Sequence, residues 1–134
     1  MESVELAISN MYALQRRQIP LCIDDFGTGY SSLSYIHQLP VESLKIDRSF
    51  VSRLTHGDEG TAMVKAILAI SRSLGIQVVA EGIETSEQFQ KLQSLGCHLG
   101  QGYLFAKPDS ALHIAEWVRH SCKPFDVQAL LSAS

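Results

Sequence analysis

Apolar residues recur along the chain with two different spacings. Spacings of three and four positions place apolar side chains on one side of a helix, and they predict helices over residues 4–16, 59–74, 85–95 and 111–118. Short runs that are wholly apolar, or that alternate with polar residues, predict strands at 21–23, 43–47, 76–80 and 101–105. Strands and helices therefore alternate, which is typical of an α/β fold.

The helical patterns also predict which side chains are buried. The first helix is expected to bury one face, formed by Val4, Ala7, Ile8, Met11 and Leu14. The second is expected to carry its apolar face on Met63, Ile67, Ile70 and Leu74. Thr85-Ser86-Glu87-Gln88 has the spacing of a capping box and predicts the start of the third, which turns Phe89, Leu92 and Leu95 inward.

Two junctions between a helix and the next strand are nearly identical, Ser-Leu-Gly-Ile-Gln at 73–77 and Ser-Leu-Gly-Cys-His at 94–98. Gly75 and Gly96 stand where a left-handed residue ends a helix. This repetition predicts about four βα units with parallel strands. A complete (β/α)8 barrel needs about 250 residues, whereas this chain has 134. We therefore predict half a barrel, completed by a missing part or by a second chain.

Composition and charge exclude several classes of protein. Lys and Arg number 11 and Asp and Glu number 14, so a net charge of −3 offers no field for a DNA or RNA polymer. No apolar run approaches the roughly 18 residues of a membrane span. The acidic N-terminus does not resemble a secretion signal, and the three cysteines lack disulfide or zinc spacing. We expect reduced thiols and a cytoplasmic protein.

Two adjacent acids end the first predicted strand. Neighbouring side chains on a strand point to opposite sides, so Asp24 and Asp25 can each serve a different cation in a two-metal site. Carboxylate oxygens favour Mg²⁺ or Mn²⁺ over Zn²⁺. The alternative is a solvated turn, in which an Asp caps the next helix and Gly27 and Gly29 adopt positive φ.

Lys45 lies between two apolar residues of the second predicted strand, so its side chain points to the opposite face from theirs. In a barrel this face is the lumen, where a lysine can hold a metal-bound water or stabilise the charge of a phosphate. The alternative is an ordinary ion pair with one of two nearby acids, Asp47 or Glu42.

Three further polar residues follow the later strands. Glu81 and Glu84 flank a glycine after an apolar strand, so one can bind metal and the other can hold a neighbouring loop. The alternative for Glu84 is the first turn of the next helix, where an acid favours the helix dipole. Gln101 cannot ionise and can only donate or accept hydrogen bonds.

Four segments together resemble one known family. They are Asp-Asp-Phe-Gly-Thr-Gly-Tyr-Ser-Ser-Leu at 24–33, Leu-Lys-Ile-Asp-Arg-Ser-Phe-Val at 44–51, Val-Ala-Glu-Gly-Ile-Glu-Thr at 79–85 and Gln-Gly-Tyr-Leu-Phe at 101–105. In this order they resemble the EAL-domain family of cyclic di-GMP phosphodiesterases. The resemblance implies a (β/α)8 barrel that uses Mg²⁺ or Mn²⁺ to hydrolyse cyclic di-GMP to linear pGpG in bacterial second-messenger signalling.

The resemblance also implies roles for individual residues. Asp24 would be a metal ligand and Asp25 would take part in the two-metal site. Lys45 would hold the attacking water, and Glu81 would act at the metal-water centre, with general base as one role open to it. Residues that would bind substrate or position loops are Glu84, Gln101, Phe26, Gly27, Thr28 and Gly29. The segment from Phe26 resembles a mobile loop that links the site to a dimer interface, which implies a homodimer.

The chain departs from the family at its N-terminal side. Nothing in it matches the Glu-Ala-Leu segment with its metal-binding Glu, or two further upstream ligands. We therefore expect residues 1–121 to be the C-terminal half of an EAL domain and 122–134 to be a tail. The expected partners are cyclic di-GMP and either the N-terminal half or a second copy, and the chain alone is expected to be inactive. The alternative is a non-catalytic module that binds cyclic di-GMP or a protein.

Overall fold

The computed structural model describes residues 2–28, 36–54 and 58–121. The elements in chain order are α1 (Glu2–Gln15), β1 (Cys22–Phe26), β2 (Ser43–Ile46), α3 (Arg48–Ser52), α4 (Asp58–Leu74), β3 (Gln77–Ala80), α5 (Ser86–Ser94), β4 (Leu99–Gly100) and α6 (Ala111–Ser121). Among the predicted features, Gly29 and the tail at 122–134 lie outside the described residues.

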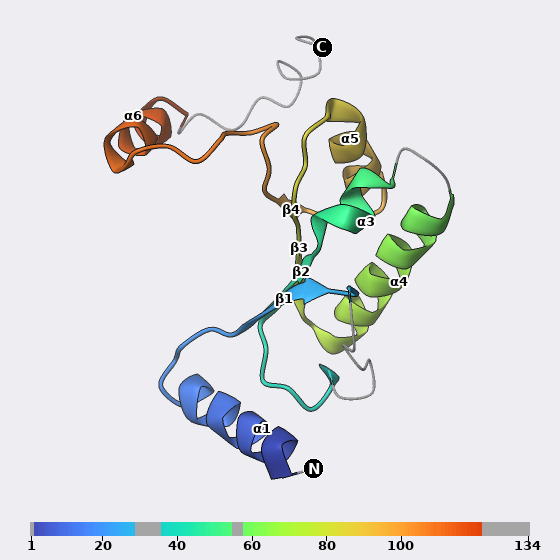
Figure 1. Cartoon of the computed structure of the whole chain (residues 1–134), viewed down its shortest axis with the longest axis vertical. Coiled ribbons are helices and arrows are strands. Elements are labelled where there is room, and N and C mark those ends of the chain that lie inside the picture. The colour runs from blue at the N-terminus through green and yellow to red at the C-terminus, as the bar shows by residue number, and fades with distance from the viewer. Residues whose placement is uncertain (1, 29–35, 55–57, 122–134) are drawn as a thin grey trace.

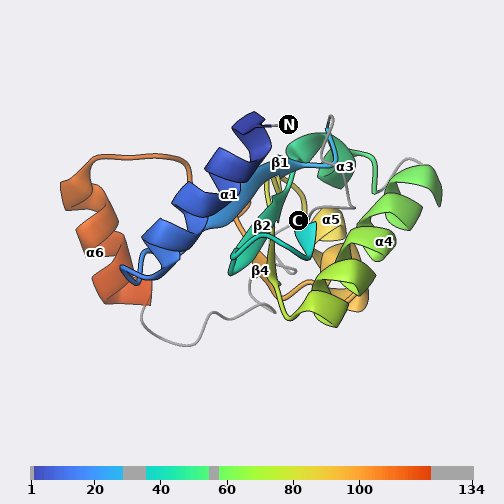
Figure 2. The ribbon, with the colours of Figure 1, turned by 90° about the horizontal axis from the view of Figure 1, so that it is seen from below.

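The strands form one parallel sheet with the order β1-β2-β3-β4, as the βα repeat predicts. The register pairs Leu44 with Ile23 on one side and with Val78 on the other. Figure 1 shows α3, α4 and α5 on one side of this sheet, whereas α1 and α6 extend away from it. Figure 2 shows the same separation from below. The fold is a partial α/β barrel.

The core lies between the sheet and the helices that cover it. Leu44 and Ile46 of β2 are fully buried, as are Val51 of α3 and Val64 of α4. Their burial contributes roughly 1.5–3 kcal/mol for each side chain. Packing of this core holds the strands in one direction, so the residues at the end of each strand lie together at the carboxyl edge of the sheet.

The buried stripe of α4 differs from the predicted one. Ile67 is buried as expected, but Met63 and Leu74 are 43% and 37% exposed. The stripe is centred on Val64, Ile67, Leu68 and Ser71 instead. A polar residue fits there because the Ser71 hydroxyl donates to the carbonyl of Ile67 at 2.8 Å. A prediction that counts only apolar residues therefore places the buried face of α4 about one residue away from where it lies.

The predicted buried face of the first helix is also wrong. Val4 and Leu14 are exposed on α1, where they were expected to be buried. The last helix is likewise uncovered, since Leu112 of α6 is 67% exposed. The spacing predicted both helices correctly, but several large apolar side chains on each of them stay exposed in the described part of the chain. Amphipathic periodicity predicts where a helix forms, but the apolar face of the helix is buried only where another part of the protein packs against it.

The fourth strand lies two residues earlier than predicted. β4 comprises only Leu99–Gly100, and residues 102–105 form a turn. The N–H of Ile83 donates to the carbonyl of Gln101, and the N–H of Leu104 donates to that of Ile83, so the chain wraps around Ile83. Gly102 permits this approach because any Cβ there would collide with the backbone of Ile83.

Local signals at the ends of helices were predicted accurately. Thr85 and Gln88 form both hydrogen bonds of the capping box at α5. Gly75 and Gly96 have φ of 69° and 81°, the left-handed conformation that ends α4 and α5. The short helix α3 was not predicted. Among the described residues, no helix has the length and apolar character needed to cross a bilayer.

Candidate functional site

The end of β1 is distorted at the two adjacent acids. The register against β2 shifts between Ile23 and Phe26, and Asp25 has a φ of 50°. The N–H of Asp25 donates to Oδ1 of Asp24 at 3.1 Å. An irregularity of this kind changes the direction of a side chain, so the expectation that the two carboxylates point apart is wrong. Both offer oxygens to the same place.

Lys45 on the neighbouring strand β2 reaches this place. Its Nζ lies 2.8 Å from Oε1 of Glu81 and 3.6 Å from Oδ1 of Asp24. The hydrogen bond to Glu81 raises the pKa of Lys45 above its ordinary value of 10.5, and partial burial opposes this shift. Lys45 therefore remains an ammonium throughout the neutral range.

The alternative partners considered for Lys45 are not its partners here. Asp47 instead caps α3, because its Oδ1 accepts the N–H of Ser49 at 2.9 Å. Glu42 is exposed, and within the described residues it forms no ion pair. The partners of Lys45 are therefore Asp24 and Glu81, at the carboxyl ends of the strands.

Glu81 lies at the centre of the arrangement. It follows β3 directly, and its Oε1 also accepts the amide Nε2 of Gln101 at 2.8 Å. The same oxygen therefore accepts from Lys45 and from Gln101. Gly82 has a φ of 69°, and a Cβ there would collide with Arg48, so glycine is required where the chain leaves the strand.

The three carboxylates form a group with the chemistry of a metal site. Asp24, Asp25 and Glu81 each offer an oxygen, and these oxygens lie within 4.8 Å of one another. The single ammonium of Lys45 balances only one of the three negative charges. An all-oxygen, anionic donor set suits a divalent cation such as Mg²⁺ or Mn²⁺. We call these three residues the carboxylate group.

The remaining predicted site residues lie around this group. Glu84 is exposed and is not part of the carboxylate group, and its N–H donates to Oε1 of Gln88 at 2.8 Å. Phe26 is buried in the core. Thr28 donates its hydroxyl to the carbonyl of Asp25 at 2.9 Å, and Gly27 has a φ of 98° between them. The predicted substrate and loop roles of these residues stay predictions.

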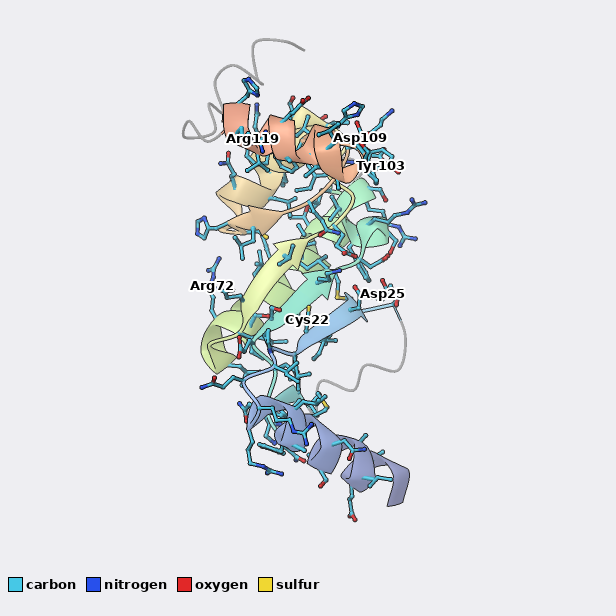
Figure 3. The ribbon with its side chains drawn as sticks, turned by 90° about the vertical axis from the view of Figure 1, so that its left-hand side faces the viewer. Cys22, Asp25, Arg72, Tyr103, Asp109 and Arg119 are labelled. Atoms are coloured by element: carbon cyan, nitrogen blue, oxygen red, sulfur yellow. The ribbon has the colours of Figure 1, made fainter. Side chains whose placement is uncertain are left out.

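Figure 3 shows how the group lies relative to the sheet. Asp25 is at the arrowhead of β1, whereas Cys22 is at the opposite end of the strand. The carboxyl ends of β1, β2 and β3 thus supply Asp24, Asp25, Lys45 and Glu81. The sequence patterns did not single out Arg48 or Tyr103, which line a cavity beside Gln101. Their position in the sequence could have identified them, because each comes shortly after the end of a strand.

Known proteins with similar sequences identify the family to which this chain belongs. The sequence matches the EAL domain over residues 1–108. It is 42% identical over 99 residues to cyclic di-GMP phosphodiesterase PA2567 of Pseudomonas aeruginosa, which is 74% of this chain and 17% of that protein. The chain therefore spans a small part of this relative.

Two solved structures are similar in fold. The phosphodiesterase MucR of Pseudomonas aeruginosa, in complex with c-di-GMP, has a TM-score of 0.79 and 41% identity, over 85% of this chain and 46% of that one. Klebsiella pneumoniae BlrP1, in complex with manganese and c-di-GMP, has a TM-score of 0.70 and 39% identity, over 75% of this chain and 26% of that one. With its parallel strands, its carboxylate group and these matches, the chain belongs to the EAL domain family.

Proposed function

We propose that this chain supplies the metal-binding and water-activating part of a phosphodiesterase that hydrolyses cyclic di-GMP to linear pGpG. The observation that carries this proposal is the contact of Lys45 and Gln101 with one oxygen of Glu81, beside Asp24 and Asp25. The relatives named above support the substrate, since one is a cyclic di-GMP phosphodiesterase and two are solved with that ligand.

The two oxygens of Glu81 have different roles in this proposal. Oε1 accepts hydrogen bonds from Lys45 and Gln101, which hold the carboxylate in one orientation. Oε2 is then left to accept a proton from an attacking water. The water oxygen bonds to phosphorus as the bond from phosphorus to the 3′ oxygen breaks, so one water is consumed and a linear dinucleotide results.

Lys45 acts as a cation and hydrogen-bond donor, and not as a base. Its raised pKa keeps it protonated at neutral pH, so it can orient the water and stabilise the negative charge that develops on the phosphate. Asp24 and Asp25 would hold Mg²⁺ or Mn²⁺ next to Glu81. Such an ion, when bound, lowers the pKa of water and neutralises charge at phosphorus.

We further propose that the chain needs a partner for turnover. It spans 46% of the solved MucR chain, and both edge strands, β1 and β4, are open on their outer sides within the described residues. The partner that fits two open parallel edges is the N-terminal half of an EAL domain, with a second copy of this chain as the competing choice. We propose that the protein is located in the cytoplasm, where thiols such as that of Cys22 stay reduced.

The test is reconstitution of the activity. This chain would be mixed with the N-terminal half of a related EAL domain, and conversion of cyclic di-GMP to pGpG would be followed with Mg²⁺ and with Mn²⁺. We expect turnover in the mixture, none from the chain alone, and a loss of at least about 100-fold in the Asp24→Ala mixture. Glu116→Ala, on exposed α6, is the matched control and should leave turnover unchanged.

Each other outcome has a definite meaning. Metal-dependent turnover by the chain alone, abolished by Asp24→Ala, would contradict the need for the other half. Tight binding of cyclic di-GMP by the chain, with no turnover in any mixture, would replace the enzyme proposal by a binding module.

A further inference from the structure

A cavity of about 370 Å³ opens at the amino ends of β3 and β4, at the opposite ends of these strands from the carboxylate group. Its lining comes from the end of α4, the start of β3 and the residues that lead into β4. Figure 3 shows Arg72, which lines this cavity, and Asp25 on opposite sides of the molecule. The volume is within the range of about 300–1,000 Å³ that is common for ligand pockets. We call it the Arg72 cavity.

The polarity of the Arg72 cavity changes from its floor to its mouth. The apolar residues in its lining are Leu68, Ile76, Val78, Cys97 and Leu99. Leu68 and Cys97 are only 4% and 5% exposed, so they form the floor. Arg72, Gln77 and His98 are exposed, so they lie at the mouth. A ligand with a polar head and an apolar tail fits this gradient.

Arg72 gives the mouth of the cavity a permanent positive charge. Among the described residues that line the cavity, none is acidic. Within the described part of the chain, no ion pair joins Arg72 to a carboxylate. Burial raises the pKa of the Cys97 thiol, and the charge of Arg72 is among the influences that oppose this shift. The guanidinium therefore lies close enough to the floor to act on a group there.

The backbone around the guanidinium leaves several of its donors free. Nη2 of Arg72 donates to the carbonyl of Leu95 at 2.7 Å, which holds the guanidinium across the end of α5. A Cβ at Gly96 would collide with this nitrogen, so glycine makes room for it. At the end of α4, the carbonyl of Ser71 accepts the N–H of Ile76 at 2.9 Å. These helix-end carbonyls already have partners, whereas Nε and Nη1 of Arg72 form no hydrogen bond within the described residues.

We propose that the Arg72 cavity binds a monocarboxylate with an unbranched hydrocarbon chain. The carboxylate accepts hydrogen bonds from the free N–H groups of Arg72 at the mouth, and the chain lies on the apolar floor. A single negative charge suits the site, because Arg72 supplies a single permanent positive one. The cavity shares no residue with the carboxylate group, so this inference does not rest on the proposed phosphodiesterase activity.

The test is calorimetric titration of the full chain with octanoate. Hexanoate has two methylenes fewer, and each buried methylene strengthens binding about fourfold, so we expect octanoate to bind at least about tenfold more tightly. Octanol has the same chain without the charge, and it should bind about tenfold more weakly than octanoate. Equal affinities for octanoate and octanol would overturn the proposal, because the guanidinium would then have no part in binding.

Variants at the mouth test the charge without touching Arg72. Gln77→Glu places a negative charge beside the head group and should weaken octanoate about fivefold, whereas Gln77→Lys should strengthen it. Gln77 is exposed at the start of β3, so the fold should accept both changes. The same two substitutions at Gln90, which is exposed on α5 and does not line the cavity, are the matched control and should leave the affinity unchanged.

Two further variants locate the site. Arg72→Gln should weaken octanoate at least about tenfold, because it removes the permanent charge. Lys45→Gln should have no effect, since Lys45 lies at the carboxyl ends of the strands. Loss of binding in Lys45→Gln would place the carboxylate at that edge and overturn the proposal. Equal effects of the substitutions at Gln77 and Gln90 would overturn it as well.

Discussion

At the scale of the residue, Asp25 combines backbone strain with a chemical role. A residue other than glycine at a φ of 50° has an unfavourable backbone. We therefore expect Asp25→Gly to have a free energy of unfolding about 1 kcal/mol higher than Asp25→Ala. We also expect Mn²⁺ to raise the melting temperature of the parent chain but not that of either variant, since both variants lack the carboxylate.

Thermal and urea unfolding, each with and without Mn²⁺, check this prediction. The same two substitutions at Glu42 are the control, because that residue is not among those with positive φ. There the glycine variant should be the less stable of the two. An Asp25→Ala variant as stable as Asp25→Gly would show that the left-handed backbone carries no cost.

At the scale of the element, the start of α3 depends on pH through Asp47. Hydrogen bonds from Ser49, first from its side chain and then from its N–H, lower the pKa of Asp47 below its ordinary value of 3.8. A lowered folded-state pKa means that the carboxylate stabilises the fold above about pH 4, and that this contribution is lost as pH falls through the folded-state pKa. Asp47→Ala should cost about 1 kcal/mol at pH 7.

The measurement is urea unfolding from pH 7 down to pH 3. The difference in unfolding free energy between the parent chain and Asp47→Ala should shrink as the pH falls below 4. Glu116→Gln, which removes one exposed negative charge, should show no such convergence. A difference that stays constant down to pH 3 would exclude the ionised cap.

The elements also show what sequence alone can predict. Signals confined to a few neighbouring residues succeeded, as in the capping box at Thr85 and the helix ends at Gly75 and Gly96. Asp24 and Glu81 were identified because parallel strands bring their carboxyl ends together. The shared direction of Asp24 and Asp25 depends on a distortion of β1, and the turn at Gly102 depends on Ile83, so neither follows from local patterns.

At the scale of the whole molecule, the exposed apolar surface predicts association. Leu6 of α1 is 63% exposed and Leu112 of α6 is 67% exposed, and the sheet has two open edges within the described residues. Soluble proteins avoid such surfaces unless another chain covers them. We expect the mass from light scattering to rise with concentration above about 10 µM. The N-terminal half of an EAL domain should replace this rise with a 1:1 complex.

Two variants locate the surface that is responsible. Leu6→Gln combined with Leu112→Gln should reduce the rise in mass, whereas Lys65→Gln, at an exposed position of α4, should not. A constant monomer mass at all concentrations for the parent chain would mean that α1 and α6 do not mediate association.

The order of the strands has a consequence for how the chain folds during its synthesis. Each of β2, β3 and β4 pairs with the strand that comes before it in the sequence. Each new strand emerging from the ribosome therefore finds its partner already made, and no strand waits for a distant one. Among the described strands β4 is the last to form, and closure of a barrel would join the rest of it to the edges of both β1 and β4.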